Sequence, residues 1–323
     1  MTLQAPLNSG FGPATTAAEV IAGRDLTGQV AVVTGGYAGI GLETVRALAS
    51  AGATVIVPAR DMGRARQALA QISGTQPEPL DLMDPASIDA FTERFLASGR
   101  PVHILVNNAG IMANPLTRDS RGFESQFSTN HLGHFHLTVR LWPALREAQG
   151  ARVVSVSSRG HRIAGVDFED PNFEWRPYDP WVAYGQSKTA NALFALRLDA
   201  LGKDHGIRAF SLHPGGILTN LARHMSPEQI RAQGAIDDEG RPVIDPARGM
   251  KNAEQGAATT VWCATSPQLD GLGGLYCEDC DVAVMNTEPQ PQARGVWPWA
   301  VDAGSAERLW TLSEALTGVR LPT

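Results

Sequence analysis

A tyrosine and a lysine stand four residues apart in the stretch WVAYGQSK, as Tyr184 and Lys188. On a helix this spacing places both side chains on one face, where an ammonium group favours a phenolate and lowers the pKa of the phenol. A free phenol, with a pKa of about 10, is a poor base at neutral pH. The pair has the chemistry of a tuned proton donor and acceptor, but Tyr-x-x-x-Lys is too common to establish a site by itself.

A glycine-rich turn follows the first apolar run of the chain, in VVTGGYAGIG at 32–41. Gly35 permits a tight turn, Gly39 lets backbone approach a pyrophosphate, and Gly41 lets the next helix pack close to the sheet. The helix that begins there presents free N–H groups and a partial positive charge to phosphates. The turn predicts a dinucleotide site, although an ordinary strand-to-helix turn can carry similar glycines.

The elements that position these residues alternate along the chain from residue 29. Apolar runs rich in β-branched residues are typical of strands buried on both faces of a parallel sheet, and they occur at 29–35, 53–57, 102–107, 152–157 and 207–213. Helical-length stretches lie between them, for example at 42–52 and 85–99. Strand–helix–strand alternation predicts an α/β fold with one doubly wound parallel sheet.

The chain is expected to hold an N-terminal arm at 1–24 and a single domain at 25–323, because no linker divides it. Residues 159–180 and 219–255 do not fit the alternation. Ligands of this architecture bind at the carboxyl edge of the sheet. Both segments are therefore expected to be substrate loops above that edge.

Composition limits the function classes. The 323 residues carry a net charge of −6, which disfavours a nucleic-acid surface. Neither a signal-peptide pattern nor an apolar stretch of membrane-spanning length is visible, and three cysteines make no disulfide framework, so we expect a cytoplasmic protein without a membrane partner. Cys277 and Cys280 resemble half of a zinc site, but the second pair is missing, and we expect two unconnected thiols and no metal.

The glycine turn reads Thr-Gly-x-x-x-Gly-Ile-Gly and resembles that of the short-chain dehydrogenase/reductase family. Three further stretches stand where family members have them: DL at 81–82, NNAG at 107–110 and HPGG at 213–216. The resemblance extends from residue 25 to about residue 221. It implies a Rossmann fold, a nicotinamide cofactor, and hydride transfer to or from a secondary alcohol, its ketone, or an aldehyde.

The same resemblance implies four catalytic residues. Tyr184 is expected to be the general acid/base, with Lys188 lowering the pKa of its phenol and holding the nicotinamide ribose. Ser158 is expected to hydrogen-bond the substrate oxygen, because the second serine of the SS pair usually acts in the family, and Ser157 should face the other way. Asn130 is expected to fix a water that extends the proton relay.

The resemblance also implies the cofactor contacts Gly35, Tyr37, Gly39, Ile40, Gly41, Arg60, Asp81, Leu82, Asn108, Ala109, Gly110, Tyr184, Lys188, Pro214, Gly215 and Thr219. Arg60 stands near the position where NAD-binding members carry an acid, and its guanidinium, with Arg64 four residues on, suits a 2′-phosphate. This favours NADP. Many NADP-binding members also carry a basic residue where this chain has Ala38, so NAD stays possible, with Arg60 on a solvated helix start.

Ser158 and Tyr184 are 26 residues apart, about twice the separation in many family members. This longer segment, together with NHLGHF around Asn130, resembles the retinol dehydrogenase and WW-domain oxidoreductase branch. The aromatic residues near it either line a pocket for a bulky apolar substrate or pack the insert against the domain; they are Phe173, Trp175, Tyr178 and Trp181.

Three histidines lie close together around Asn130 in the sequence. The histidines of NHLGHFH carry no metal pattern and are expected to pack or to face solvent; they are His131, His134 and His136. A homo-oligomer, dimer or tetramer, is expected from the family. Two other functions stay open: a non-catalytic dinucleotide-binding sensor or partner protein on the same fold, which loss of Tyr184, Lys188 or Ser158 would favour, and a nucleotide-sugar epimerase, whose Gly-x-x-Gly-x-x-Gly spacing is incomplete here.

Overall fold

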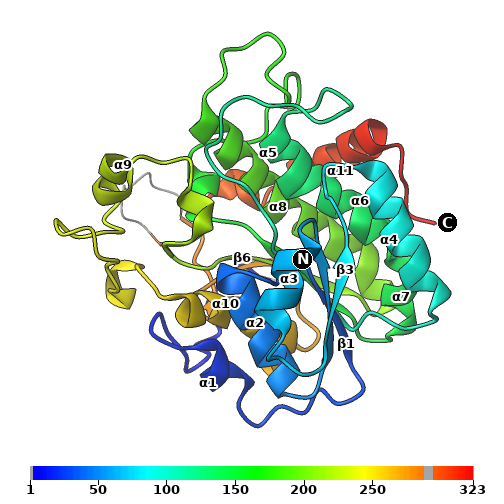
Figure 1. The fold of residues 1–323 in the computed structure, drawn as a ribbon. Helices are drawn as coiled ribbons and strands as arrows, with labels where there is room; N and C mark the ends of the chain where they lie inside the picture. Colours follow the sequence, from blue (N-terminus) through cyan, green and yellow to red (C-terminus); the bar gives the residue numbers. More distant parts are fainter. Residues whose placement is uncertain (1–2, 287–293, 323) are drawn as a thin grey trace.

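The computed structural model describes residues 3–286 and 294–322 (Figure 1). Within these ranges the chain forms an eight-stranded sheet in the order β3-β2-β1-β4-β5-β6-β7-β8, parallel throughout except between β7 and β8. The strands are β1 (Val30–Val33), β2 (Thr54–Ala59), β3 (Thr75–Pro79), β4 (Ile104–Asn107), β5 (Arg152–Val156), β6 (Arg208–His213), β7 (Leu275–Glu278) and β8 (Asp281–Val282). The predicted α/β doubly wound sheet is confirmed, and its order reverses between β1 and β4, where ligands bind in such sheets.

The strands that the sequence predicted are the central ones. Every residue of β1 and β4 is buried, and so is every residue but the first of β2, β5 and β6. The apolar pattern did not predict β3, because this strand reads TQPEP. It lies at the edge of the sheet, where prolines are tolerated and side chains stay partly exposed.

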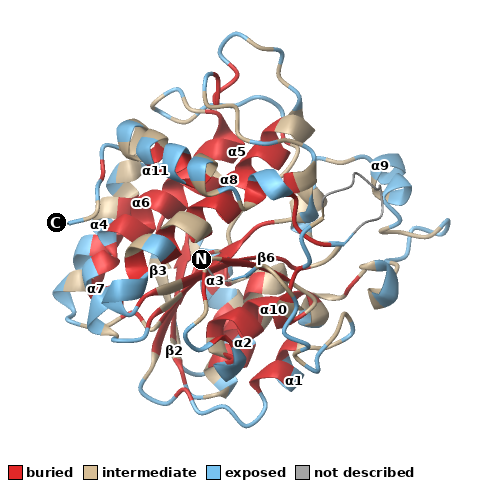
Figure 2. Ribbon diagram, turned by 180° about the vertical axis from the view of Figure 1, so that it is seen from behind, coloured by how far each residue is buried: buried red, intermediate tan, exposed pale blue. Residues whose placement is uncertain are grey.

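Helices cover both faces of the sheet (Figures 1 and 2). One face packs against α1 (Ala17–Ile21), α2 (Gly39–Ser50), α3 (Met62–Leu69) and α10 (Ala253–Thr265). The other packs against α4 (Pro85–Ala97), α6 (Gly133–Arg140), α7 (Trp142–Glu147), α8 (Pro180–Gly202) and α11 (Ala303–Thr317). Two short helices, α5 (Ser125–Phe127) and α9 (Pro227–Ala232), lie in connections above the sheet.

Residues 3–24, the described part of the predicted N-terminal arm, pack against the domain. The Gln4 amide donates to the carbonyl oxygens of Tyr276 (2.7 Å) and Ala283 (2.6 Å) and accepts the N–H of Tyr276 at 3.0 Å. Helix α1 packs against α10. The arm therefore contacts β7 through Gln4 and packs on α10 and α2 through α1.

Helix α8 carries Tyr184 and Lys188 and is buried on nearly every side. Asp179 caps its start by accepting two backbone N–H bonds of 2.8 and 2.9 Å. Helix α11 covers its outer side, where the ring of Phe194 stacks on Trp310 with centroids 6.0 Å apart. Within the described residues no helix, α8 included, has the length and apolar character needed to cross a membrane.

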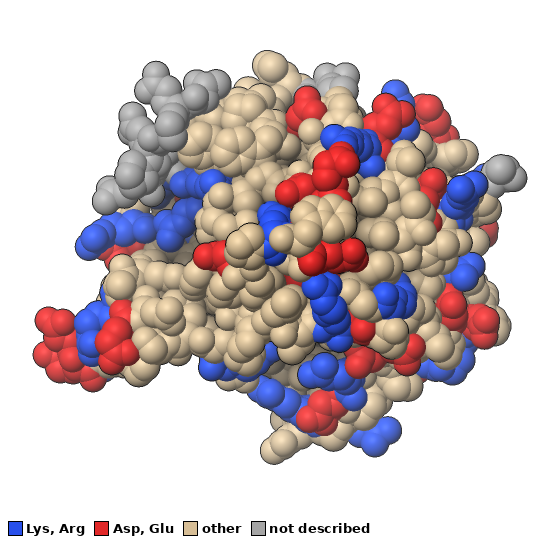
Figure 3. Space-filling model, turned by 90° about the horizontal axis from the view of Figure 1, so that it is seen from above, with Lys and Arg blue, Asp and Glu red and all other residues tan. Residues whose placement is uncertain are grey.

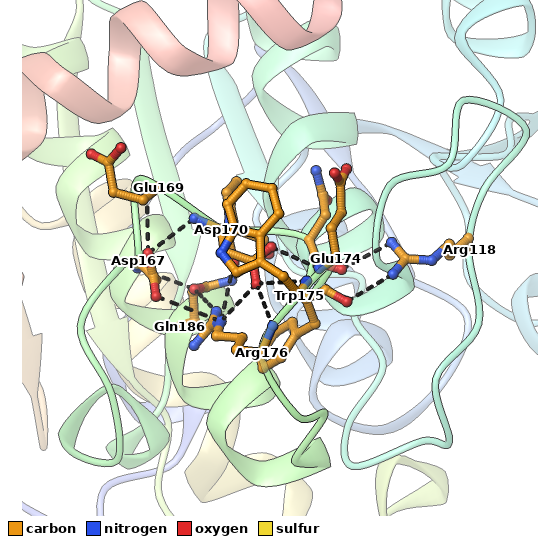
Figure 4. Close-up of polar contacts among 11 residues, drawn as sticks. Arg118, Asp167, Glu169, Asp170, Glu174, Trp175, Arg176 and Gln186 are labelled. Carbon is orange, nitrogen blue, oxygen red and sulfur yellow. Dashed lines mark hydrogen bonds and ion pairs between the residues drawn. The ribbon is translucent and has the colours of Figure 1, made fainter.

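The segment 159–180, predicted to be a substrate loop, forms a hydrogen-bonded cap over the start of α8 (Figure 4). Asp170 is buried and accepts the backbone N–H groups of residues 174–176 at 2.7 to 3.3 Å. Arg176 donates to the Gln186 side chain on α8 at 2.8 Å. These contacts fix the insert to the helix that bears Tyr184.

Candidate active site

Three glycines shape the turn between β1 and α2. Gly35 (φ +65°) and Gly39 (φ +53°) adopt the left-handed conformation that glycine tolerates. A Cβ on Gly41 would lie 2.5 Å from the carbonyl oxygen of Gly35 and 2.5 Å from Nδ2 of Asn108. Position 41 therefore has no room for a side chain, and the turn packs tightly against the end of β4.

Helix α2 begins at this turn without a side-chain cap, because its N-cap residue is Ala38. Ala38, Gly39 and Ile40 line a cavity of about 1280 Å³. Uncapped N–H groups and the helix dipole together bind phosphate well. The residues present therefore fit the pyrophosphate of a dinucleotide.

Thr34 joins the ends of β1 and β4. Its hydroxyl oxygen accepts the N–H groups of Asn108 (2.9 Å) and Ala109 (3.0 Å) and lies 2.8 Å from Nε2 of His134. Nδ1 of His134 lies 3.0 Å from the carbonyl oxygen of Asn130 and therefore carries the proton, so Nε2 accepts from the Thr34 hydroxyl. His134, expected only to pack or to face solvent, is therefore a buried link between the glycine turn and Asn130.

Tyr184 and Lys188 lie together beside the end of β5, as the helical spacing predicts. Their exposed fractions are 4% and 3%, and Nζ of Lys188 lies 5.7 Å from the centre of the Tyr184 ring. Nζ donates to the carbonyl oxygen of Val156 at 3.0 Å. In the described part of the chain, no carboxylate forms an ion pair with Lys188.

Burial dominates the protonation of this pair. It raises the pKa of Tyr184 to about 12, against a smaller lowering by the hydrogen bond with Ser158. It also lowers the pKa of Lys188 to about 8. Burial thus sets the pKa of the phenol above its usual value in the protein alone, in place of the expected lowering, and holds Tyr184 in its proton-donating form.

The two serines after β5 face opposite ways, as strand alternation predicts. Ser157 is buried and donates to the carbonyl oxygen of Lys188 at 2.6 Å. Ser158 lines the cavity, where its Oγ accepts the N–H of Gly160 at 3.0 Å and hydrogen-bonds the Tyr184 side chain. Ser158 is therefore the serine that stands beside the phenol.

His161, which the sequence did not single out, holds the backbone of Ser158. Its Nε2 accepts the N–H of Trp297 at 3.2 Å, so its Nδ1 carries the proton and donates to the Ser158 carbonyl oxygen at 2.7 Å. The Tyr276 hydroxyl donates to the same carbonyl at 3.2 Å. Burial lowers the pKa of His161 to about 4, which keeps the ring neutral in this position.

Asn130 lies in a π-helical turn, Ser128–Leu132, just before α6. Its Nδ2 donates to the carbonyl oxygen of Ile111 (3.0 Å) and to Oγ of Ser187 (2.9 Å), while its Oδ1 accepts the N–H of Ile111 at 2.9 Å. The side chain therefore joins the loop after β4 to α8. π-helical turns are frequent at functional sites.

Most of the predicted site residues line the larger cavity: Gly35, Tyr37, Gly39, Ile40, Arg60, Asn108, Ala109, Gly110, Ser158, Tyr184, Lys188, Pro214, Gly215 and Thr219. Asp81 and Leu82 instead line an adjoining cavity of about 510 Å³, which shares Gly35 and Arg60 with the first. Gly41 and Asn130 line neither cavity, since they pack behind the turn and beneath the loop after β4.

The sequence did not predict much of the cavity wall: Met112, Arg159, Arg162, His213, Leu221, Arg223, Met225, Ile230 and Met250 also line it. His213 was within reach of prediction, because it begins the HPGG stretch; its Nδ1 accepts the N–H of Arg159 at 3.0 Å. The last five come from 219–255, whose sequence has no periodicity to interpret.

The aromatic residues near the insert divide between the two expected roles. Trp181 lines the cavity. Phe173 and Tyr178 pack against each other with ring centroids 5.1 Å apart, so they hold the insert together. Trp175 does neither, as its exposed fraction is 71%.

The other two histidines of NHLGHFH, His131 and His136, and the three cysteines are buried. His131 lies 2.7 Å from Oγ of Ser313, and His136 lies 2.9 Å from Oδ1 of Asp89. Cys277 and Cys280 are free thiols. Across residues 3–286 and 294–322, no three side chains of the metal-binding types gather into a metal site.

Comparison with known families decides the identity of this arrangement. The family model described as short chain dehydrogenase matches residues 29–230. The chain belongs to the short-chain dehydrogenase/reductase family. It is accordingly an oxidoreductase of a family that binds a nicotinamide dinucleotide.

Curated relatives agree with the predicted branch. A probable oxidoreductase of Streptomyces antibioticus is 48% identical over 293 residues, 88% of this chain and 96% of that protein. Retinol dehydrogenase 12 of Homo sapiens is 38% identical over 301 residues, 91% of this chain and 88% of that protein. The WW domain-containing oxidoreductase of Homo sapiens is 36% identical over 325 residues, 96% of this chain and 73% of that protein. The resemblance to this branch of the family is confirmed.

A solved structure described as the Pseudomonas aeruginosa RhlG/NADP active-site complex is also similar to this chain. It is 25% identical, with a TM-score of 0.60, and the match covers 79% of this chain and 95% of that one.

The packing around Gly41 makes a test of the turn. Gly41→Ala places a methyl group against Gly35 and Asn108, and we expect it to weaken NADPH binding by roughly tenfold or more, since overpacking shifts the turn. Gly63→Ala in the first turn of α3 is the matched control, because a Cβ there meets nothing closer than 3.5 Å. Titration of NADPH fluorescence measures both, and equal affinities for the two variants would contradict the account.

Proposed function

We propose that this protein is an NADP(H)-dependent oxidoreductase that interconverts a bulky, apolar ketone or aldehyde and its alcohol, with Tyr184 as general acid/base. The observation that carries the proposal is the single cavity that brings Ser158, Tyr184 and Lys188 together with the glycine turn. A non-catalytic sensor would have no need of the buried pair.

The four polar residues have distinct tasks in this reaction. The bound nicotinamide supplies or accepts the hydride at the carbonyl carbon. In the reducing direction Tyr184 donates its proton to the carbonyl oxygen, and Ser158 hydrogen-bonds that oxygen as negative charge develops on it. Lys188 favours the phenolate that remains, and Asn130 holds the loop after β4 against α8. In the oxidising direction the proton returns from the alcohol to the phenolate.

The choice of NADP rests on Arg60. Arg60 follows β2 directly and lines both cavities, and Arg64 lines the larger one, so two guanidinium groups are available to a 2′-phosphate. The similarity to a protein solved with NADP supports the same choice.

The choice of a bulky apolar substrate rests on apolar side chains that line the larger cavity. Trp181 is one of them, and 219–255 contributes others, among them Leu221, Met225 and Ile230. Apolar walls with a few polar groups are typical of sites for such ligands.

The proposal includes a cytoplasmic, homo-oligomeric protein. The three free cysteines suit a reducing compartment. The family resemblance supports an oligomer, and an interface over α8 would have to include α11, because α11 covers the outer side of α8.

The phenol is the first target for a test. We expect Tyr184→Phe to lower kcat for ketone or aldehyde reduction by about 100-fold or more while NADPH binding stays intact, because only the proton donor is lost. Tyr178→Phe, which removes a hydroxyl from the insert, is the matched control and should retain most of the activity. Steady-state NADPH oxidation measures kcat for both variants, and unchanged turnover in Tyr184→Phe would contradict the mechanism.

Cofactor choice is tested at Arg60. Arg60→Asp is expected to weaken NADPH binding by about tenfold or more and to leave NADH nearly unaffected, because the new carboxylate repels only the 2′-phosphate. Arg66→Asp, an equal charge change on the exposed side of α3, is the control. Calorimetric titration with each cofactor reads the outcome, and equal losses for NADPH and NADH would refute NADP preference.

A further inference from the structure

The wall of the larger cavity is strongly asymmetric in charge. Six cationic side chains line it: Arg60, Arg64, Arg159, Arg162, Lys188 and Arg223. No Asp or Glu is among the described residues that line it, although the whole chain has 33 acidic and 27 basic residues. Figure 3 shows positive and negative side chains mixed on the outer surface, in contrast to the positive lining of the cavity. A cavity wall that carries only positive charge focuses an electric field that attracts anions.

The cofactor accounts for only part of this charge. Arg60 and Arg223 line both cavities and therefore stand where the larger one meets the smaller, beside the glycine turn. Arg159 and Arg162 line the larger cavity alone, and Arg159 directly follows Ser158. The backbone of Gly160 packs against the Tyr184 ring, so both arginines belong to the segment beside the reacting residues.

Arg159 is free to bind a ligand there. Its backbone N–H is held by Nδ1 of His213 at 3.0 Å, so the start of the side chain is fixed. Within residues 3–286 and 294–322 its guanidinium has no ion pair and no hydrogen bond, and the side chain is exposed to the cavity. A fixed backbone with an unpaired, exposed guanidinium is suited to forked binding of a planar anion.

Arg162, three residues after Arg159, lines the same cavity and adds to its charge. Its Nη2 donates to the carbonyl oxygen of Gly295 at 3.2 Å, while its buried Nε has no hydrogen-bond partner among the described residues. Burial, and to a lesser degree the neighbouring charge of Arg159, lower the pKa of Arg162, whereas Glu278 opposes this shift. The two arginines repel each other, and an anion bound between them would offset that repulsion.

We propose that Arg159, supported by Arg162, binds an anionic group of the substrate, so that the substrate is an apolar aldehyde or ketone bearing a carboxylate near its carbonyl. The inference rests on the proposed function, because it assigns the substrate class of that same site. Ser158 and Tyr184 hold the carbonyl oxygen, and Arg159, one residue after Ser158, holds the carboxylate. The apolar wall from 219–255 then contacts the rest of the molecule.

Matched pairs of aromatic aldehydes test the inference. The probes are 3- and 4-carboxybenzaldehyde, each against its methyl ester, which has the same ring and aldehyde but no charge. NADPH oxidation gives kcat/KM for each, and calorimetric titration without turnover gives affinity. We expect at least one of the two carboxybenzaldehydes to have kcat/KM and affinity about tenfold higher than its methyl ester. A charge-assisted, forked hydrogen bond implies a difference of this size.

Substitutions show which side chain causes the preference for the carboxylate over its ester. Arg159→Gln should abolish the preference, mainly through KM and binding, and lower kcat/KM for the carboxylates far more than for the esters. Arg146→Gln, an exposed position on α7, changes the net charge equally and should keep the preference. Arg162→Gln should reduce it in part.

The outcomes separate the two proposals. Turnover of esters and carboxylates with equal kcat/KM and equal affinity, or a preference that persists in Arg159→Gln, would overturn the inference and leave the oxidoreductase function standing. Preferential binding of a carboxylate that Arg159→Gln abolishes, without turnover of any aldehyde, would support the anion site and count against the proposed function. Absence of both preferential binding and turnover would overturn both.

Discussion

Burial of an ammonium group beside a phenol, without a carboxylate partner in the described residues, is the constraint on which this site depends. Lys188 is almost completely buried, and the hydrogen bond from its Nζ to Val156 replaces only part of its hydration. The opposite pKa shifts of Tyr184 and Lys188 follow from that burial. A charge held in this way is stabilised further by any negative charge that forms nearby, and the phenolate left by proton transfer is such a charge. The electrostatic cost of burying the Lys188 charge is therefore lowest when the phenolate forms, which is the step that the site performs.

The rest of the structure keeps this pair in place. Asp179 fixes the start of α8, α11 covers its outer side, and Asn130 connects it to the loop after β4. On the other wall His161 holds the Ser158 carbonyl. All these supports come from elements far apart in sequence, and they hold the pair at the carboxyl edge of one parallel sheet.

The sequence predicted the site best where a local physical requirement limits the choice of residue type or spacing. The glycines at 35, 39 and 41 predicted a turn that has no room for side chains, and the spacing of Tyr184 and Lys188 predicted their common face. The central strands followed from their continuous apolar character. Family resemblance then singled out Ser158 over Ser157, and the two side chains do face opposite ways.

What the sequence could not predict depends on three-dimensional contact. The pKa of Tyr184 lies above its usual value because the side chain is buried, and the degree of burial is a property of packing. The roles of His134 and His161 are set by partners on other elements, namely Thr34, Asn130 and Trp297. β3 is an edge strand with two prolines, and local sequence did not identify it.

The most direct test of the central claim is the pH dependence of stability in Lys188→Met. The unfolded lysine has a pKa of 10.5 and the folded one about 8, so the unfolded chain binds more protons between these values and wild-type stability rises with pH across that window. Urea unfolding at pH 7 and pH 9.5 should show the stability of Lys188→Met, relative to wild type, falling by about 2 kcal/mol at the higher pH. A stability difference that is the same at both pH values would contradict the burial of an unpaired Lys188.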